Sequence, residues 1–293
     1  MAVIAAPRVT IRSLGAYLAL AKPVAILPHF VTAAAAMFLA AGGAPPPAAV
    51  LFTLLGGGCV AAAANTVNSY LDRDIDALMA RTRRRPLPAG RVNPDATLLF
   101  AAVIGLAGLF ILGGLVNRVA AALALAALAY YILPYTLWLK RRTYWGAIIG
   151  SGAGAIPPLI GWAAVTNRIE PAPFLLASVV VLWTLPHFWT LAVSRRDDYA
   201  RAGLKVLPQK GVAATIIICS VLLVAVSLAL VWAAGLGEFY LVSAAALGAV
   251  FLYLAFRMNF GGTPRTAGRF FAYSVFYIAA LFGAMIVDVA AFR

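Results

Sequence analysis

Long apolar stretches alternate with short polar ones along the whole chain. Nine of the apolar stretches have roughly 20 residues, which is enough to cross the hydrocarbon core of a bilayer as a helix. Backbone groups inside a bilayer must bond internally and the stretches show no period-two alternation, so we predict helices rather than barrel strands. The predicted spans cover residues 24–41, 47–70, 96–115, 119–139, 145–166, 174–193, 212–234, 239–257 and 270–290. The first helix is predicted to extend back towards Leu14, with a break at Pro23.

Basic residues between these spans fall almost entirely on one side. With nine spans, 20 of the 23 Lys and Arg residues lie on the side of the amino terminus. The other side carries only Arg118, Arg168 and Arg293. Because cytoplasmic loops carry an excess of Lys and Arg, we expect the amino terminus and the loops after even-numbered spans to be cytoplasmic. The pattern predicts an all-α polytopic membrane protein with nine transmembrane helices.

Composition excludes several classes of protein. Hydrophobic residues make up 64% of the chain and charged residues 11%, which excludes a soluble enzyme and a disordered protein. The two cysteines, Cys59 and Cys219, lie in apolar stretches and form no disulfide framework. The net charge of +14 is carried between spans, so we expect contact with a lipid bilayer and none with nucleic acid.

The amino-terminal segment lacks the marks of a cleaved leader. Its first 22 residues contain no uninterrupted apolar run followed by a small-residue cleavage site, and they do not have the composition of a transit peptide. We expect a bacterial cytoplasmic membrane as the location. We also expect residues 1–293 to form one integral-membrane domain, with residues 1–13 as a flexible cytoplasmic segment.

A polar segment after the second span carries the first candidate chemistry. Asn68, Asp72 and Asp76 are spaced four apart, so a helix continuing from the span places all three on one face, with Asp74 on the opposite side. Like charges at this spacing repel each other, which a bound divalent cation would explain. Basic residues follow between positions 81 and 91 and suit an anionic ligand. An ordinary acidic helix end followed by a basic anchor loop is the alternative.

A second polar segment follows the sixth span. Asp197 and Asp198 stand there among five basic residues, and both acidic clusters come at the end of an even-numbered span. Two oxygen-bearing clusters that face each other across a helical bundle would form a Mg²⁺ site suited to a diphosphate. A solvated charged loop is the alternative. The diphosphate hypothesis requires that the two clusters share a cavity.

Several motifs resemble those of UbiA-type intramembrane prenyltransferases. The run Asn68-x-x-x-Asp72-x-x-x-Asp76, followed by Arg81-Thr and Arg85-Pro-Leu-Pro, is similar to the first motif of that superfamily. The form Met-x-Arg-Thr-x-x-Arg-Pro-Leu resembles its protoheme IX farnesyltransferase (haem O synthase) branch. Further segments resemble the same branch: Ala155-Ile-Pro-Pro-Leu-Ile-Gly161-Trp162, Trp183-Thr-Leu-Pro-His187-Phe188-Trp189, and Asp198-Tyr199-x-x-Ala-Gly203 with Leu207-Pro208.

The resemblance implies a nine-helix bundle that transfers a farnesyl group from farnesyl diphosphate to a vinyl group of haem b, with Mg²⁺ as cofactor. A downstream enzyme that modifies the haem product is an expected partner. In the second motif, Arg195 and Tyr199 occupy positions where acids often stand, which leaves Asp197 and Asp198 as its acids. The implied catalytic residues are Asn68, Asp72, Asp76 and Asp198. The implied metal ligands are Asn68, Asp72, Asp76, Asp197 and Asp198.

Other side chains are candidates for holding the substrates. The expected substrate-binding residues are Lys22, Arg81, Arg85, Lys140, His187, Tyr199, Arg201 and Lys205. Aromatic rings that face an allylic cation would stabilise it, and the candidates are Tyr135, Trp183, Phe188 and Trp189. His187 lies inside the sixth span, where an ionisable group indicates function, although a hydrogen bond between helices is the alternative. We interpret His29 as structural.

Three other functions remain open on the sequence. A prenyltransferase acting on the aromatic ring of a quinone precursor would share the metal site and differ in its acceptor cavity. A transporter would be expected to carry charge at mid-membrane on a broken helix, and Gly56-Gly57-Gly58 is a candidate break. Close helix packing is the alternative explanation of these glycines. A haem carrier without enzymatic activity is the third function.

Overall fold

A computed structural model describes residues 11–208, 210–259 and 263–292. Nine helical stretches among these residues are long and apolar enough to cross a membrane, and this number confirms the predicted spans. The described elements are α1 (Ile11–Ala21), α2 (Pro23–Ala41), α3 (Pro47–Leu71), α4 (Arg73–Leu78), α5 (Pro94–Ile111), the π-helix η1 (Leu112–Val116), α6 (Arg118–Tyr130), the π-helix η2 (Tyr131–Leu139), α7 (Trp145–Gly154), α8 (Ile156–Thr166), α9 (Ala172–Ser194), α10 (Arg196–Arg201), α11 (Val212–Ala233), α12 (Glu238–Asn259) and α13 (Pro264–Phe292).

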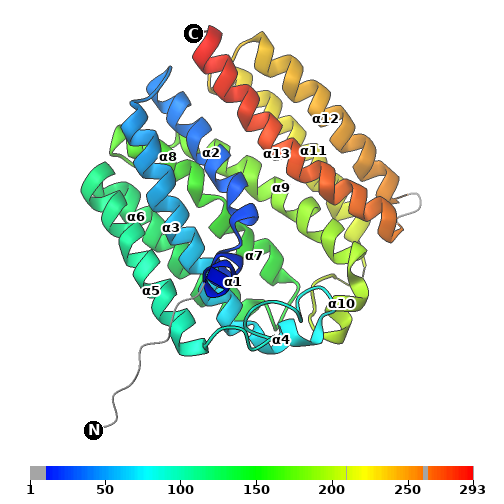
Figure 1. The fold of residues 1–293 in the computed structure, drawn as a ribbon. Coiled ribbons are helices and arrows are strands. Elements are labelled where there is room, and N and C mark those ends of the chain that lie inside the picture. The colour runs from blue at the N-terminus through cyan, green and yellow to red at the C-terminus, as the bar shows by residue number, and fades with distance from the viewer. Residues whose placement is uncertain (1–10, 209, 260–262, 293) are drawn as a thin grey trace.

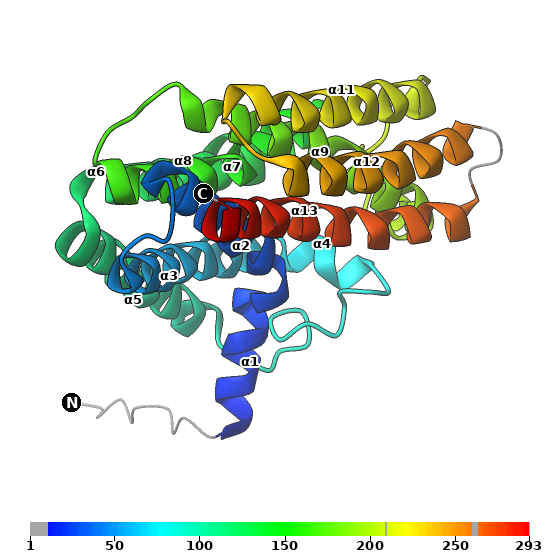
Figure 2. The same ribbon diagram turned by 90° about the horizontal axis from the view of Figure 1, so that it is seen from above.

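The long helices lie side by side in a bundle, and the short helices α4 and α10 lie together at one end of it (Figure 1). The carboxyl-terminal end of α13 lies at the opposite end. Helix α1 leaves the bundle at a steep angle to α2 (Figure 2). The polar segments that follow the second and sixth spans are therefore neighbours in space.

The predicted break at Pro23 is confirmed, because Lys22 separates α1 from α2. Lys22 has φ 53°, a left-handed backbone conformation that residues other than glycine rarely adopt. The predicted flexible segment 1–13 falls mainly on residues 1–10, which lie outside the described residues, and α1 begins at Ile11.

The fifth predicted span is two helices rather than one. Helix α7 ends at Gly154 and α8 begins at Ile156, followed by Pro157 and Pro158. Proline lacks the backbone N–H that a continuous helix needs and disfavours helical geometry in the residue before it, so the helix is interrupted here. Residues of both helices line the larger cavity described below.

Two glycines allow helices to approach closely. A Cβ added to Gly161 of α8 would lie 2.1 Å from the carbonyl oxygen of Ala33 in α2. A Cβ added to Gly56 of α3 would lie 3.0 Å from the carbonyl oxygen of Gly108 in α5. Helix α3 runs without interruption through Gly56-Gly57-Gly58, so the transporter-like break is not found. Close packing accounts for Gly56 and for Gly58, whose added Cβ would lie 2.8 Å from the Phe30 ring, but not for Gly57, which has nothing within 4 Å.

Candidate active site

The end of α3 presents the first polar cluster to the interior. Asp72 joins α3 to α4, and its N–H donates to the Asn68 carbonyl over 2.9 Å while its own carbonyl accepts from Asp76 N–H over 2.8 Å. The helical spacing therefore continues through the junction. Asn68, Asp72 and Asp76 are buried, whereas the side chain of Asp74 is 60% exposed. The predicted face and the opposite position of Asp74 are confirmed.

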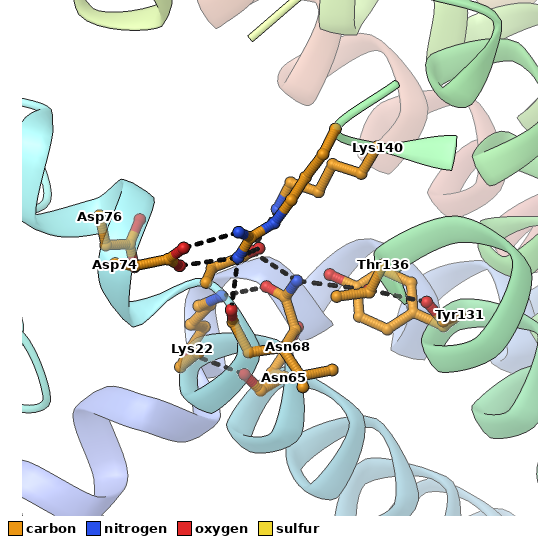
Figure 3. Close-up of polar contacts among 12 residues, drawn as sticks. Lys22, Asn65, Asn68, Asp74, Asp76, Tyr131, Thr136 and Lys140 are labelled. Carbon is orange, nitrogen blue, oxygen red and sulfur yellow. Dashed lines mark hydrogen bonds and ion pairs between the residues drawn. The ribbon is translucent and has the colours of Figure 1, made fainter. Parts of the chain in front are cut away.

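Each member of this cluster holds a basic side chain. Lys22 Nζ donates to Asn68 Oδ1 over 2.9 Å, and Arg85 Nη1 donates to Asp76 Oδ2 over 2.8 Å. Lys140 forms an ion pair with Asp72. In Figure 3, Lys22 and Asn68 point towards each other and Lys140 reaches in from the other side. These cations come from three separate segments that meet at the end of the bundle.

Local backbone features place two of these cations. The left-handed conformation of Lys22 turns the chain between α1 and α2, and Asn65 Nδ2 fixes the turn by donating to the Ala21 carbonyl over 3.0 Å. Lys140 follows the π-helix η2, which contains Pro134. The wider turn of a π-helix often occurs at functional sites, and here the residue directly after it pairs with Asp72.

These side chains line a polar cavity of about 140 Å³. Two carboxylates, Asp72 and Asp76, face five basic side chains in its lining, which are Lys22, Arg81, Arg85, Lys140 and Lys205. Burial lowers the pKa of Lys22 to about 7, and the positive charges of Arg85 and Lys140 act in the same direction. With five basic side chains against two carboxylates, the cavity has an excess of positive charge that favours a polyanionic ligand.

The donor set fits a divalent cation that also binds such a ligand. Asp72 Oδ1 is enclosed and forms no hydrogen bond in the described part of the chain, although Arg141 Nη2 lies 3.9 Å away. Asn68 and Asp76 add oxygens beside it. The described residues contain no group of three or more His, Cys, Asp or Glu side chains arranged for a metal ion. Mg²⁺ is commonly held by one or two carboxylates together with substrate phosphates, which this set of oxygens would allow.

The second polar segment contributes two of the expected substrate-binding residues but not the expected metal ligands. Tyr199 and Lys205 line the polar cavity. Asp198 does not line it: its carboxylate accepts the Ala80 N–H over 3.0 Å and forms an ion pair with Arg201. Burial works against the charge on Asp198, but these two partners outweigh it and lower the pKa of the carboxyl group. Asp197 is exposed and, like Arg201, lies outside the cavity lining.

A larger apolar cavity of about 740 Å³ adjoins the polar one. Four residues line both cavities: Lys22, Arg85, Tyr135 and Phe188. The apolar lining comes from α2, α3, α6, η2, α7, α8, α9 and α13. Of the aromatic candidates, Tyr135, Trp183 and Phe188 line it, whereas Trp189 is packed in the core. An elongated apolar group can thus lie in one cavity while an anionic group attached to it lies in the other.

Both histidines line the apolar cavity. The ring of His187 is stacked between Trp183 and Phe271, with centroid distances of 4.4 and 4.6 Å. His29 Nδ1 is enclosed without a hydrogen-bond partner among the described residues, which is unusual for a polar atom inside a membrane helix. The cavity lining therefore includes His29, which the sequence led us to interpret as structural.

Several residues near the site were not expected. Arg141 binds both carboxylate oxygens of Asp74 over 2.6 and 2.7 Å and so holds α4 beside η2. Thr136 lies 3.4 Å from Asn68 Nδ2. Asn65 could have been found, because it stands three residues before Asn68 on the same helix face. Arg141 and Thr136 are about 70 residues away in the chain, and no local pattern links them to the cluster.

Comparison with known proteins gives a consistent assignment of family. Residues 29–282 match the model of the UbiA prenyltransferase family. A protein named protoheme IX farnesyltransferase from Roseiflexus castenholzii is 44% identical over 233 residues, which are 78% of this chain and 44% of that protein. The protein of the same name from Symbiobacterium thermophilum is 44% identical over 232 residues, which are 77% of this chain and 78% of that protein. The chain thus spans less than half the length of the Roseiflexus relative.

Two solved structures share the fold. A structure described in work on digeranylgeranylglyceryl phosphate synthase has a TM-score of 0.75 at 19% identity, covering 94% of this chain and 98% of that one. A UbiA homologue from Archaeoglobus fulgidus bound to GPP and Mg²⁺ has a TM-score of 0.64 at 18% identity, covering 92% of this chain and 99% of that one.

Proposed function

The chain belongs to the UbiA prenyltransferase family, and from this premise we propose that it is a protoheme IX farnesyltransferase. It transfers the farnesyl group of farnesyl diphosphate to a vinyl group of haem b, and water adds to give haem O. The relatives at 44% identity carry that name. The observation that carries the proposal is the junction of a cation-rich cavity with a large apolar one at Lys22, Arg85, Tyr135 and Phe188.

In this proposal the polar cavity holds the diphosphate. Lys22, Arg81, Arg85, Lys140 and Lys205 face it, and their charge favours departure of the diphosphate with the electron pair of the allylic C–O bond. Asn68, Asp72 and Asp76 would hold Mg²⁺, which supplies further stabilisation of the developing negative charge when bound. The predicted metal role of Asp197 and Asp198 is replaced here by a structural role for Asp198 and none for Asp197.

The apolar cavity holds the farnesyl chain and the acceptor. Tyr135, Trp183 and Phe188 present aromatic surfaces that stabilise the allylic cation. The vinyl π electrons of the acceptor form the new carbon–carbon bond, and the resulting cation beside the porphyrin takes up water and releases a proton. His187 contacts the acceptor. Helices from both ends of the chain, including α2 and α13, line this one cavity. We therefore propose that the chain works as a single domain.

We also propose that the polar cavity faces the cytoplasm from a bacterial cytoplasmic membrane. The support is the distribution of charge, since 20 of 23 Lys and Arg residues lie on the side of the predicted spans that carries both polar segments. A downstream enzyme that receives the haem product remains an expected partner.

Mass spectrometry tests the proposed reaction. Purified protein incubated with farnesyl diphosphate, Mg²⁺ and haem b should give a haem heavier by a hydroxyfarnesyl group, and chelation of the metal should stop its formation. Expression in a host that lacks its own haem O synthase should produce the same haem. If haem b is unmodified while the aromatic ring of a quinone precursor is prenylated, the acceptor assignment is wrong.

Replacement of Asp198 by Asn distinguishes a structural role from metal binding. Asn keeps an oxygen for the Ala80 N–H and loses the ion pair with Arg201, so we expect a destabilisation of about 1 kcal/mol or less and a turnover reduced by less than about tenfold. Thermal unfolding and turnover in detergent measure the two effects. Asp95→Asn, at the exposed start of α5, is the matched control. A hundredfold loss of turnover at unchanged stability would instead support a metal-binding role for Asp198.

A further inference from the structure

One residue of α13 contacts two of the aromatic side chains of α9 that line the apolar cavity, Trp183 and His187. The backbone carbonyl of Ser274 accepts the indole N–H of Trp183 over 2.7 Å. Its hydroxyl oxygen lies 2.7 Å from Nδ1 of His187. Ser274 is completely buried, and Phe271 from the preceding turn stacks on the face of His187 opposite Trp183. The His187 ring is therefore held on both faces and at one nitrogen.

The hydrogen bonds around Ser274 determine which nitrogen of His187 carries the proton. A serine hydroxyl has a single hydrogen. Ser274 Oγ lies 2.6 Å from the carbonyl oxygen of Phe271, an atom that can only accept, so the hydroxyl hydrogen is used there. The contact between Ser274 and His187 then requires Nδ1 of His187 to be the donor. The opposite tautomer would leave two lone pairs facing each other across 2.7 Å.

The other nitrogen of His187 is left with a free electron pair. Nε2 forms no hydrogen bond with any residue in the described ranges, and the ring lines the apolar cavity. We propose that Ser274 is a positioning residue that fixes His187 as the Nδ1–H tautomer and so presents Nε2 to the acceptor as an electron-pair donor. A hydrogen bond at one nitrogen commonly orients a histidine whose other nitrogen binds a metal.

The identity of the group that Nε2 meets rests on the proposed function. If haem b is the acceptor, its iron is the centre in that molecule that takes a neutral imidazole nitrogen. Loss of the Ser274 hydroxyl leaves the buried Nδ1–H without an acceptor, which should shift the tautomer ratio by about tenfold to hundredfold towards Nε2–H. A protonated Nε2 has no electron pair for iron.

Nitrogen NMR reads the tautomer without any substrate. The chain contains two histidines, so protein labelled with ¹⁵N-histidine gives two imidazole spin systems, and His29→Phe identifies the signal of His187. We expect Nδ1–H in the wild type, a shift of at least about tenfold towards Nε2–H in Ser274→Ala, and recovery of Nδ1–H in Ser274→Thr. Ser220→Ala is the matched control, because Ser220 is equally buried and its hydroxyl bonds only within α11.

Binding of haem b in the absence of farnesyl diphosphate tests the consequence. Ser274→Ala should weaken haem binding about tenfold and alter the ligand-sensitive absorption of the iron, while binding of iron-free protoporphyrin and the KM for farnesyl diphosphate stay unchanged. An unchanged tautomer ratio in Ser274→Ala, or Nε2–H in the wild type, would overturn the inference even if haem O is formed. Absence of haem O with the expected tautomers would overturn the proposed function instead.

Discussion

Replacing Asp72 with Asn should lower the rate of prenyl transfer by about 10³-fold, which corresponds to about 4 kcal/mol of transition-state stabilisation. The variant keeps the size of the side chain and removes the charge that would hold the metal. Asp72 Oδ1 is an enclosed carboxylate oxygen without a hydrogen bond in the described residues, so the loss falls on the group that a cation would contact. Turnover at saturating Mg²⁺ and farnesyl diphosphate measures the effect.

Asp74→Asn is the matched control for this variant. It makes the same chemical change two residues away, on a side chain directed out of the cavity and bound to Arg141. We expect a loss of no more than a few-fold, since exposed ion pairs contribute little. Equal losses in the two variants, or full turnover of Asp72→Asn, would contradict the assignment of Asp72 as a metal ligand.

Replacing Gly161 with Ala should destabilise the protein by about 3 kcal/mol and lower its thermal midpoint by roughly 5–10 °C. The added Cβ would lie 2.1 Å from the Ala33 carbonyl oxygen, and this atom belongs to the backbone of α2 and cannot rotate away. Helices α2 and α8 must therefore separate. Helix α2 also carries His29 and follows Lys22, so the apolar cavity should change shape and turnover should fall with stability.

Gly283→Ala provides the comparison. Gly283 lies within α13, and a Cβ added there meets no atom within 4 Å. Because alanine favours the helix over glycine, we expect this variant to be as stable as the wild type or slightly more so. Thermal unfolding of both variants in the same detergent measures the difference. Equal midpoints for Gly161→Ala and Gly283→Ala would contradict the steric conflict predicted between α2 and α8.

The sequence was sufficient for the architecture because the membrane constrains it strongly. Apolar length fixes the spans, and the alternation of basic loops depends on counting them correctly. The break at Pro23 followed from the chemistry of proline, while the break between α7 and α8 was missed although Pro157 and Pro158 offered the same signal. The π-helix that leads to Lys140 contains Pro134, but a proline within an apolar stretch does not by itself specify a π-helical turn.

The site was predictable where its residues are close in the chain. Helical spacing placed Asn68, Asp72 and Asp76 on one buried face. Spacing could not show that Asp198 turns towards the Ala80 N–H, because that contact joins residues 118 positions apart. The same limit applies to Ser274, which meets His187 across 87 positions. Such contacts depend on how helices pack, and packing is decided by the whole bundle.

Position 22 has two separate demands to meet. The backbone there has a left-handed φ of 53°, which glycine would adopt without cost, and the side chain bonds to Asn68 over 2.9 Å. Glycine would relieve the backbone strain but lose the hydrogen bond to Asn68, whereas arginine would keep a positive charge with a different shape and reach. Lysine at position 22 thus keeps the bond to Asn68 at the cost of a strained backbone. A substitution there that relieves the backbone loses the side-chain contact.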